Sequence, residues 1–147
     1  MKATILFRIT AVLFVLFAAG HTFGFLTFAP PTQEGMAVRD AMNNVHFEVK
    51  GTIYSYGGFY RGFGLSATMS MVFEAFLAWY LGGMARRRAP ETRTLGWAFV
   101  AWQVAGVVLA KLYFGVPPLI LGIALTLLLG VATWLADVSG NAGSTPA

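Results

Sequence analysis

The chain has no cysteine, and only 11% of its 147 residues are charged. The absence of cysteine excludes a disulfide framework, a thiolate nucleophile and a cysteine-ligated metal centre. Soluble domains carry about a quarter charged residues, so the low charge argues against a soluble domain and a disordered tail. Hydrophobic residues make up 57% of the chain, which indicates an integral membrane protein.

The net charge of +4 comes from an uneven distribution of cations. Three of the ten Lys and Arg residues form the run 86–88, and Arg93 follows closely. This basic run lies between two apolar segments, where membrane topology explains it. We therefore expect no nucleic-acid partner.

Four apolar segments reach the length of about 20 residues that a helix needs to cross a hydrocarbon core about 30 Å thick. The sequence therefore predicts an all-α membrane fold, a bundle of four transmembrane helices. Residues 1–137 are expected to form one membrane domain, and residues 138–147 a flexible tail. The predicted spans cover residues 5–28, 54–81, 95–114 and 118–136.

The flanking cations predict the orientation. Cations flank the N-terminus and the turn between the second and third spans, which places both in the cytoplasm; they are Lys2, Arg8 and the arginines of 86–93. With four spans the C-terminus is cytoplasmic as well. The segment 30–53 then forms one longer outer loop of a protein in the cell (cytoplasmic) membrane. The first span also has features of a cleaved signal peptide, but its apolar run to Phe28 favours a retained helix.

The outer segment 30–53 is long for so small a protein and is not of low complexity. Thr32 is a suitable N-cap for a short helix over 33–43, and the alternation in 45–49 predicts an extended piece. Two roles are considered for this segment: it covers a site in the membrane as a lid, or it packs against the lipid headgroups.

Small residues recur every four positions on three of the predicted spans. Such rows let helices approach closely, and they could also bind a second copy of the chain. The rows are Gly20 and Gly24; Gly58, Gly62, Ser66 and Ser70, leading to Glu74; and Gly122, Thr126 and Gly130.

His21, Tyr60 and Arg61 are predicted to lie at equal depth in the outer half of the first two spans. They form either a polar cluster that joins the helices or a ligand site. In the second case His21 exchanges a proton, Tyr60 donates a hydrogen bond and Arg61 holds an anion or carbonyl. Phe17 lies on an aromatic stripe that would line the apolar part of the pocket.

Glu74 lies deep in the second span, where a charged group is costly, so it needs a partner. It is either a structural carboxylic acid or, with His21, a catalytic acid. Gln103 is expected to hydrogen-bond between helices and Lys111 to extend toward the outer surface, and both are further candidates for the ligand site. The partners considered for Glu74 are Thr10, the indole of Trp97 and Arg8.

Two histidines without close carboxylate or histidine partners give no metal-ligand spacing. The glycine pairs of 57–64 follow no strand and precede no Lys-Ser/Thr, so no phosphate-binding loop is predicted. We expect neither a metal nor a cofactor.

Two segments resemble a known family. Gly20-His21-Thr22-Phe23-Gly24 and the segment from Phe59 to Leu65 are similar to the GHTxG and FYxGFGL motifs of an uncharacterised bacterial family of small four-helix membrane proteins. Members of that family often have Trp-Asp before the Phe-Tyr pair, where this chain has Gly57-Gly58. The resemblance covers about the first half of the chain and implies the fold and the focus on His21 and Tyr60, not a reaction.

Three functional classes remain. The first is a protein that binds membrane lipid or another lipophilic small molecule near the outer leaflet, around His21, Tyr60 and Arg61. The second is an intramembrane acid–base enzyme, such as an isomerase, hydratase or cyclase acting on a lipid-soluble substrate. The third is a structural or accessory subunit of a membrane complex, associating through the small-residue rows, or a small transporter.

Overall fold

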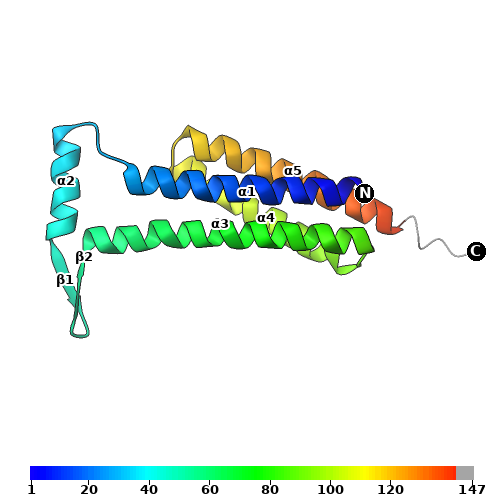
Figure 1. Cartoon of the computed structure of the whole chain (residues 1–147), viewed down its shortest axis with the longest axis horizontal. Helices are drawn as coiled ribbons and strands as arrows, with labels where there is room; N and C mark the ends of the chain where they lie inside the picture. Colours follow the sequence, from blue (N-terminus) through cyan, green and yellow to red (C-terminus); the bar gives the residue numbers. More distant parts are fainter. Residues whose placement is uncertain (142–147) are drawn as a thin grey trace, which may run out of the picture. The chain divides into compact units, whose positions relative to one another are not determined.

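The computed structural model describes residues 1–141. Four of its five helices are long and apolar enough to cross a membrane, which confirms the predicted all-α class and the four predicted apolar helices. Along the chain the elements are α1 (Lys2–Thr27), α2 (Gln33–Asn44), β1 (His46–Val49), β2 (Thr52–Ser55), α3 (Tyr56–Arg87), α4 (Glu91–Tyr113) and α5 (Val116–Asn141) (Figure 1). Because α5 continues to Asn141, the first part of the predicted tail is helical, and residues 142–147 lie outside the described residues.

The segment between α1 and α3 contains the predicted short helix α2, the predicted extended piece as β1, and one unpredicted strand, β2. Helix α2 begins after Thr32, whose side chain accepts a hydrogen bond from the Gly35 amide at 3.1 Å, as the N-cap prediction required. An antiparallel hairpin follows, in which Val49 pairs with Thr52. The second span was predicted to start at about Tyr54; the helix begins at Tyr56, because Tyr54 belongs to β2.

The hairpin turn consists of Lys50 and Gly51, which have φ angles of 50° and 82°. Two consecutive positive φ angles are typical of the type I′ turn, whose twist matches that of the flanking strands. Gly51 adopts this conformation without steric cost, whereas Lys50 adopts it against the usual preference of a residue with a Cβ.

Helix α3 extends six residues beyond its predicted end, and its last turn contains Arg86 and Arg87. Cations in the last turn interact favourably with the helix dipole. The helix ends in a Schellman motif, since the amides of Arg88 and Ala89 donate to the carbonyls of Ala85 and Met84 at 3.3 and 3.1 Å. Arg88 has a φ of 54° in this cap, a position that usually holds glycine.

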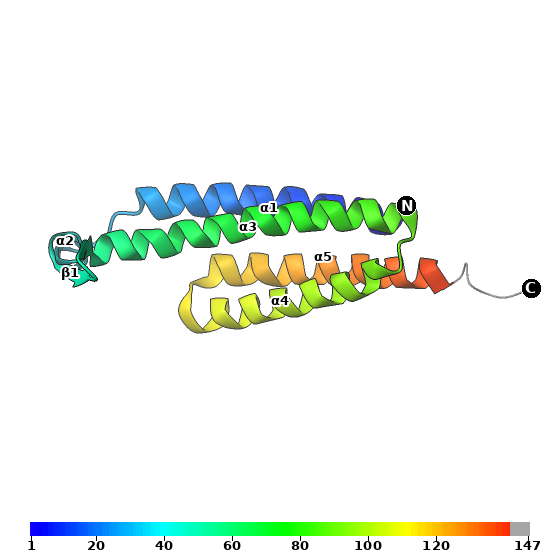
Figure 2. The same cartoon turned by 90° about the horizontal axis from the view of Figure 1, so that it is seen from below.

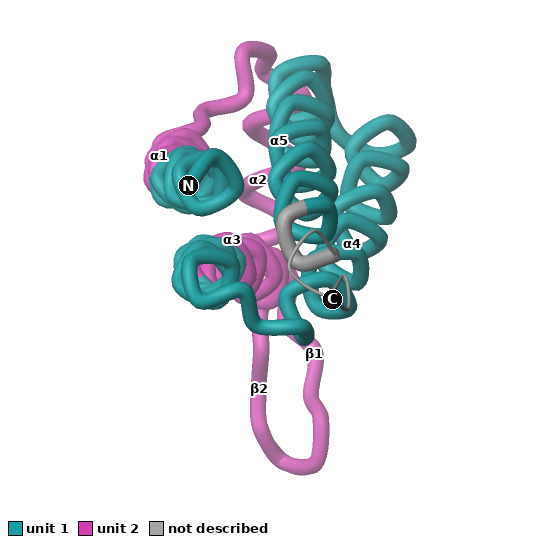
Figure 3. The backbone as a smooth tube through the Cα atoms, turned by 90° about the vertical axis from the view of Figure 1, so that its right-hand side faces the viewer, with its two compact units in different colours: residues 1–15, 73–147 teal, residues 16–72 magenta. Residues whose placement is uncertain are grey.

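The chain divides into two compact units (Figure 3). Unit 1 contains residues 1–15 and 73–147, and unit 2 contains residues 16–72. In unit 1, α4 and α5 are antiparallel and pack closely along their length (Figure 2). Their approach is tightest at Gly96, where an added Cβ would lie 2.6 Å from the Thr133 hydroxyl. Phe14 and Phe99 stack in the core of this unit, with ring centroids 5.8 Å apart.

The small-residue rows do not mark most of the close approaches between helices. An added Cβ at Gly20, Gly24, Gly62 or Gly130 would have no neighbour within 4 Å, although one at Gly122 would contact Val107. The prediction that these rows pack against another helix therefore holds at Gly122 and is not met at the other four glycines. Side chains of another helix also lie close to glycines outside the rows: Gly57, Gly64, Gly82 and Gly96.

Many hydroxyl groups within the helices are satisfied locally, whereas the buried hydroxyls of Thr4, Thr92 and Thr133 have no hydrogen-bond partner within residues 1–141. The following side chains donate to the backbone carbonyl four residues earlier, at 2.7–3.1 Å: Thr10, Thr22, Thr27, Ser66, Ser70 and Thr126. Such bonds are a common way to pair a polar hydrogen inside a helix. They require no contact with a second helix.

Candidate functional site

His21 is half-buried in unit 2 and connects α1 to α3. Its Nε2 lies 3.2 Å from the carbonyl oxygen of Gly64. A carbonyl only accepts hydrogen bonds, so Nε2 carries the hydrogen and donates it. The Nε2–H of the imidazole is therefore occupied by a hydrogen bond to the backbone of α3.

Phe25 lies between His21 and Tyr60 in a series of three rings. The His21 and Phe25 rings are stacked, with centroids 5.8 Å apart and planes 11° apart. The Phe25 and Tyr60 centroids are 5.4 Å apart. Gly64 makes room for this arrangement, because an added Cβ would clash with the Phe25 ring.

The structure changes the contacts that were predicted among His21, Tyr60 and Arg61. His21 and Tyr60 belong to one ring cluster, but the described contacts of His21 are with Gly64 and Phe25. Tyr60 is 60% exposed, and Arg61 is exposed as well. The residue of α3 that lies beside His21 is Gly64, one helical turn beyond Tyr60. The prediction was displaced because residues of β2 had been counted as part of the span.

A second polar contact lies beside the first. The hydroxyls of Thr22 and Thr68 are 2.8 Å apart, and Thr22 is also 2.7 Å from the carbonyl of Ala18. The Thr68 hydroxyl in turn lies 3.4 Å from the carbonyl of Gly64, so each hydroxyl has a carbonyl acceptor on its own helix and either can be the donor between them. With the bond from His21 to Gly64, this contact forms a polar seam between α1 and α3 in unit 2.

The remaining predicted ligand residues are distributed between the two units. Phe17 is half-buried in unit 2. The ring that stacks on His21 belongs to Phe25 and not to Phe17. Phe25 follows His21 by four residues, a spacing that puts two side chains on one helix face and could have revealed the pair. Gln103 is buried in unit 1 with 7% exposure, whereas Lys111 is exposed.

Glu74 has a partner that the sequence did not predict. The Trp102 indole Nε1–H donates to Oε1 of Glu74 at 2.6 Å. Trp97, Thr10 and Arg8 had been expected instead. The Thr10 hydroxyl donates to Leu6, and the Arg8 guanidinium lies 3.2 Å from the centre of the Trp79 ring. The contact between Glu74 and Trp102 joins α3 to α4 in unit 1.

An aromatic cluster, also not predicted, surrounds the hairpin. The Phe47 ring contacts the rings of Tyr54, Tyr56 and Phe59, at centroid distances of 4.8–5.9 Å. Phe59 in turn packs edge-on against Phe63. The cluster fixes the hairpin to the first turns of α3, so aromatic side chains cover the start of this helix.

No protein-family model, curated protein or solved structure matches the chain. Residues 1–141 contain no group of three or more His, Asp or Glu side chains arranged to hold a metal ion. The resemblance to the bacterial family with GHTxG and FYxGFGL segments stays a prediction.

Proposed function

We propose that the chain is an integral protein of the bacterial cell membrane, with both termini in the cytoplasm. The proposal is supported by Lys2 at the start of α1 and by Arg86, Arg87 and Arg88, which lie in the last turn of α3 and directly after it. Short cytoplasmic loops carry an excess of Lys and Arg. In this orientation α2 and the hairpin face the outside.

We further propose that its function is to bind a lipid-like or other apolar ligand at the outer halves of α1 and α3. The observation that supports this is the ring series His21, Phe25 and Tyr60, which ends in an exposed phenol next to the exposed Arg61. Aromatic rings provide an apolar surface, and a phenol and a guanidinium bind the polar head of an amphiphile.

In this proposal the residues have different roles. Tyr60 and Arg61 contact the ligand, with Arg61 holding a carbonyl or an anionic group. His21 is a positioning residue, because its Nε2–H is bonded to Gly64 and its ring stacks on Phe25. Loss of the imidazole would therefore displace Phe25 and, through it, Tyr60.

The test is to purify the protein in a mild detergent, extract co-purifying lipids and identify them by mass spectrometry. Arg61→Ala and His21→Ala are expected to lose a bound species that the wild type retains. Lys50→Ala is the matched control, since it removes an exposed cation at the tip of the hairpin. An unchanged lipid profile in both site variants would contradict the proposal.

A second candidate function is acid–base catalysis within the membrane, and the contact between Glu74 and Trp102 favours it. A carboxyl at such depth, held by an indole N–H, can transfer a proton to or from a lipid-soluble substrate. An isomerase of this kind removes a carbon-bound proton and returns a proton from solvent to a different carbon.

We expect deuterium incorporation into a lipid when the wild type is incubated with a native lipid extract in heavy water. Glu74→Gln keeps an oxygen that accepts the hydrogen bond of Trp102 but removes the acid, so incorporation should stop. Mass spectrometry of the lipids measures this. Equal incorporation by Glu74→Gln would remove Glu74 as the catalyst, and none by the wild type would reject this candidate.

A further inference from the structure

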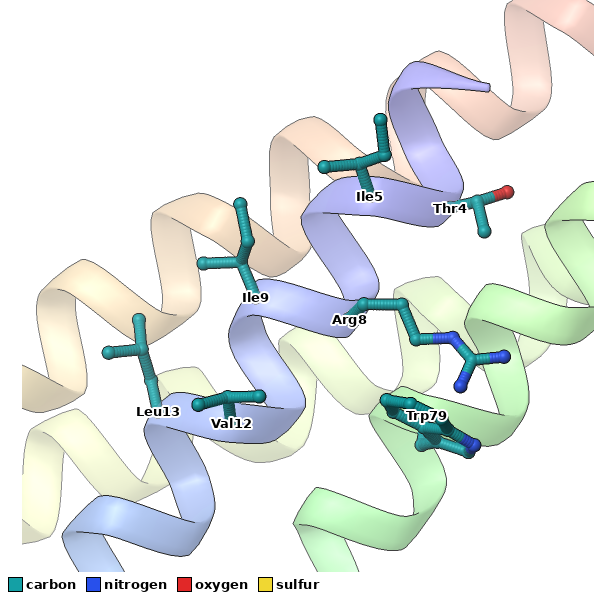
Figure 4. Close-up of a pocket in the computed structure, with 7 residues that line it drawn as sticks. All are labelled: Thr4, Ile5, Arg8, Ile9, Val12, Leu13 and Trp79. Atoms are coloured by element: carbon teal, nitrogen blue, oxygen red, sulfur yellow. The ribbon is translucent and has the colours of Figure 1, made fainter.

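An open groove runs along α1 within unit 1, at a site that the sequence did not indicate. Its volume is about 370 Å³. Trp79 of α3 also lines the groove, and Figure 4 shows the Arg8 side chain extending from α1 toward this ring. The groove is lined by Thr4, Ile5, Arg8, Ile9, Val12, Leu13 and Trp79.

The lining of the groove consists mainly of apolar side chains and contains one cation, Arg8. Ile5, Ile9 and Val12 are each about half exposed, and Leu13 continues the apolar wall. This wall follows α1 past Arg8 and into the span. A ligand that fits both parts must therefore be apolar along most of its length and negatively charged at one end.

Arg8 is held with its flat face on the indole of Trp79, 3.2 Å from the ring centre. Gly82 allows this approach, because an added Cβ would lie 3.3 Å from Nε of Arg8. Stacking uses the face of the guanidinium, while its N–H groups point outward in the plane. These N–H groups form a fork that matches two oxygens of a phosphate.

The charge of Arg8 has no carboxylate partner among the described residues. Of the three carboxylates in unit 1, Glu74 binds Trp102, and Asp137 lies 3.5 Å from Arg93. The third, Glu91, lies in the first turn of α4 without an ion pair to Arg8. The same end of the unit also has an excess of positive charge: six of the ten cations and two of the six acids of the chain. The cations are Lys2, Arg8, Arg86, Arg87, Arg88 and Arg93, and the acids are Glu91 and Asp137.

We propose that this groove binds an anionic phospholipid from the leaflet that meets the basic end of unit 1. The headgroup phosphate binds Arg8, and one acyl chain lies along Ile9, Val12 and Leu13. Arg8 follows Lys2 by six residues, about 9 Å along the helix, which suits the boundary between headgroups and hydrocarbon. A soluble anion would not need the apolar wall, so the occupant is a lipid.

The experiment uses the full chain in detergent, titrated with phosphatidylglycerol or with phosphatidylcholine of the same acyl chains. Native mass spectrometry measures the bound lipid. We expect the wild type to prefer phosphatidylglycerol, and Arg8→Gln to weaken its binding about fivefold. The matched control is Arg86→Gln, which removes a cation at the same end outside the groove and should change binding by less than about twofold.

A second variant tests the apolar part without changing any charge. Val12→Phe fills the groove from a half-exposed position, so it should weaken phosphatidylglycerol binding while the protein stays folded. Unchanged binding by Val12→Phe would overturn the proposal, as would equal losses in Arg8→Gln and Arg86→Gln. Equal binding of the two lipids by the wild type would do the same. None of these variants alters His21, Tyr60 or Arg61, so the result is independent of the ligand site proposed there.

Discussion

At the scale of single residues, the imidazole of His21 and the carboxyl of Glu74 each bind a neighbouring helix through a specific atom. His21 donates to the Gly64 backbone, and Glu74 accepts from the indole of Trp102. A buried polar group that is left without a partner costs about 1–3 kcal/mol, so these bonds hold the helices in register.

The sequence predicted that His21 and Glu74 need partners, but it did not predict which ones. Counting residues from the ends of a span gives depth, whereas the partner also depends on how each helix is rotated about its axis. Trp97 and Trp102 are five residues apart on α4, so they point in different directions, about 140° apart. Only packing decides that Trp102 faces Glu74.

Gly64 provides a prediction at this scale. Gly64→Ala should lower the free energy of unfolding by about 1–3 kcal/mol, because the new Cβ must displace the Phe25 ring from its place between His21 and Tyr60. Thermal unfolding in detergent, followed by circular dichroism, measures the change.

The matched control is Gly62→Ala on the same helix, where a Cβ has open space. It should leave the stability unchanged or raise it by up to about 1 kcal/mol, since alanine favours the helix. Equal effects of the two variants would show that Phe25 does not occupy the space beside Gly64.

At the scale of elements, the long helices and the first strand of the hairpin were predictable, whereas the second strand and its pairing were not. Four apolar runs of sufficient length define the spans, and Thr32 correctly marks the start of α2. The hairpin depends on Lys50-Gly51, a weaker signal for a type I′ turn than Asn-Gly. Its second strand, Thr52–Ser55, was hidden because its apolar and aromatic residues also fit the start of a membrane span.

The end of α3 provides a prediction for an element. Arg88→Gly should raise the free energy of unfolding by about 0.5–1 kcal/mol, because glycine adopts the left-handed conformation of this cap without strain. Arg86→Gly removes the same charge from the helical last turn and should lower it by about 1 kcal/mol. Changes of the same sign, measured by thermal unfolding, would argue against the cap.

At the scale of the whole molecule, the cations are concentrated at one end of unit 1, which predicts the orientation in the membrane. The chain has no native cysteine, so single cysteines can be placed without background labelling. Glu48→Cys, in the exposed hairpin, should react with a membrane-impermeant maleimide in intact cells. Arg87→Cys should react only after the membrane is permeabilised, and the reverse pattern would invert the topology.

Association with other chains stays a prediction. The row of Gly62, Ser66 and Ser70 on α3 is exposed, and Gly62 has open space around it. Close approach of small residues is a common mode of helix association in lipid. The cross-linking of single cysteines placed along this row would test whether a second copy lies there.

The hydroxyls that bond to their own helices also bear on how the protein is made. Thr10, Thr22, Ser66, Ser70 and Thr126 donate to carbonyls four residues earlier, so these side chains bring no unpaired hydrogen into lipid. Each of these hydroxyls can then enter the membrane already paired, before the neighbouring helices have been synthesised. The bonds that His21 and Glu74 make to α3 and α4, by contrast, form only after the helices have met.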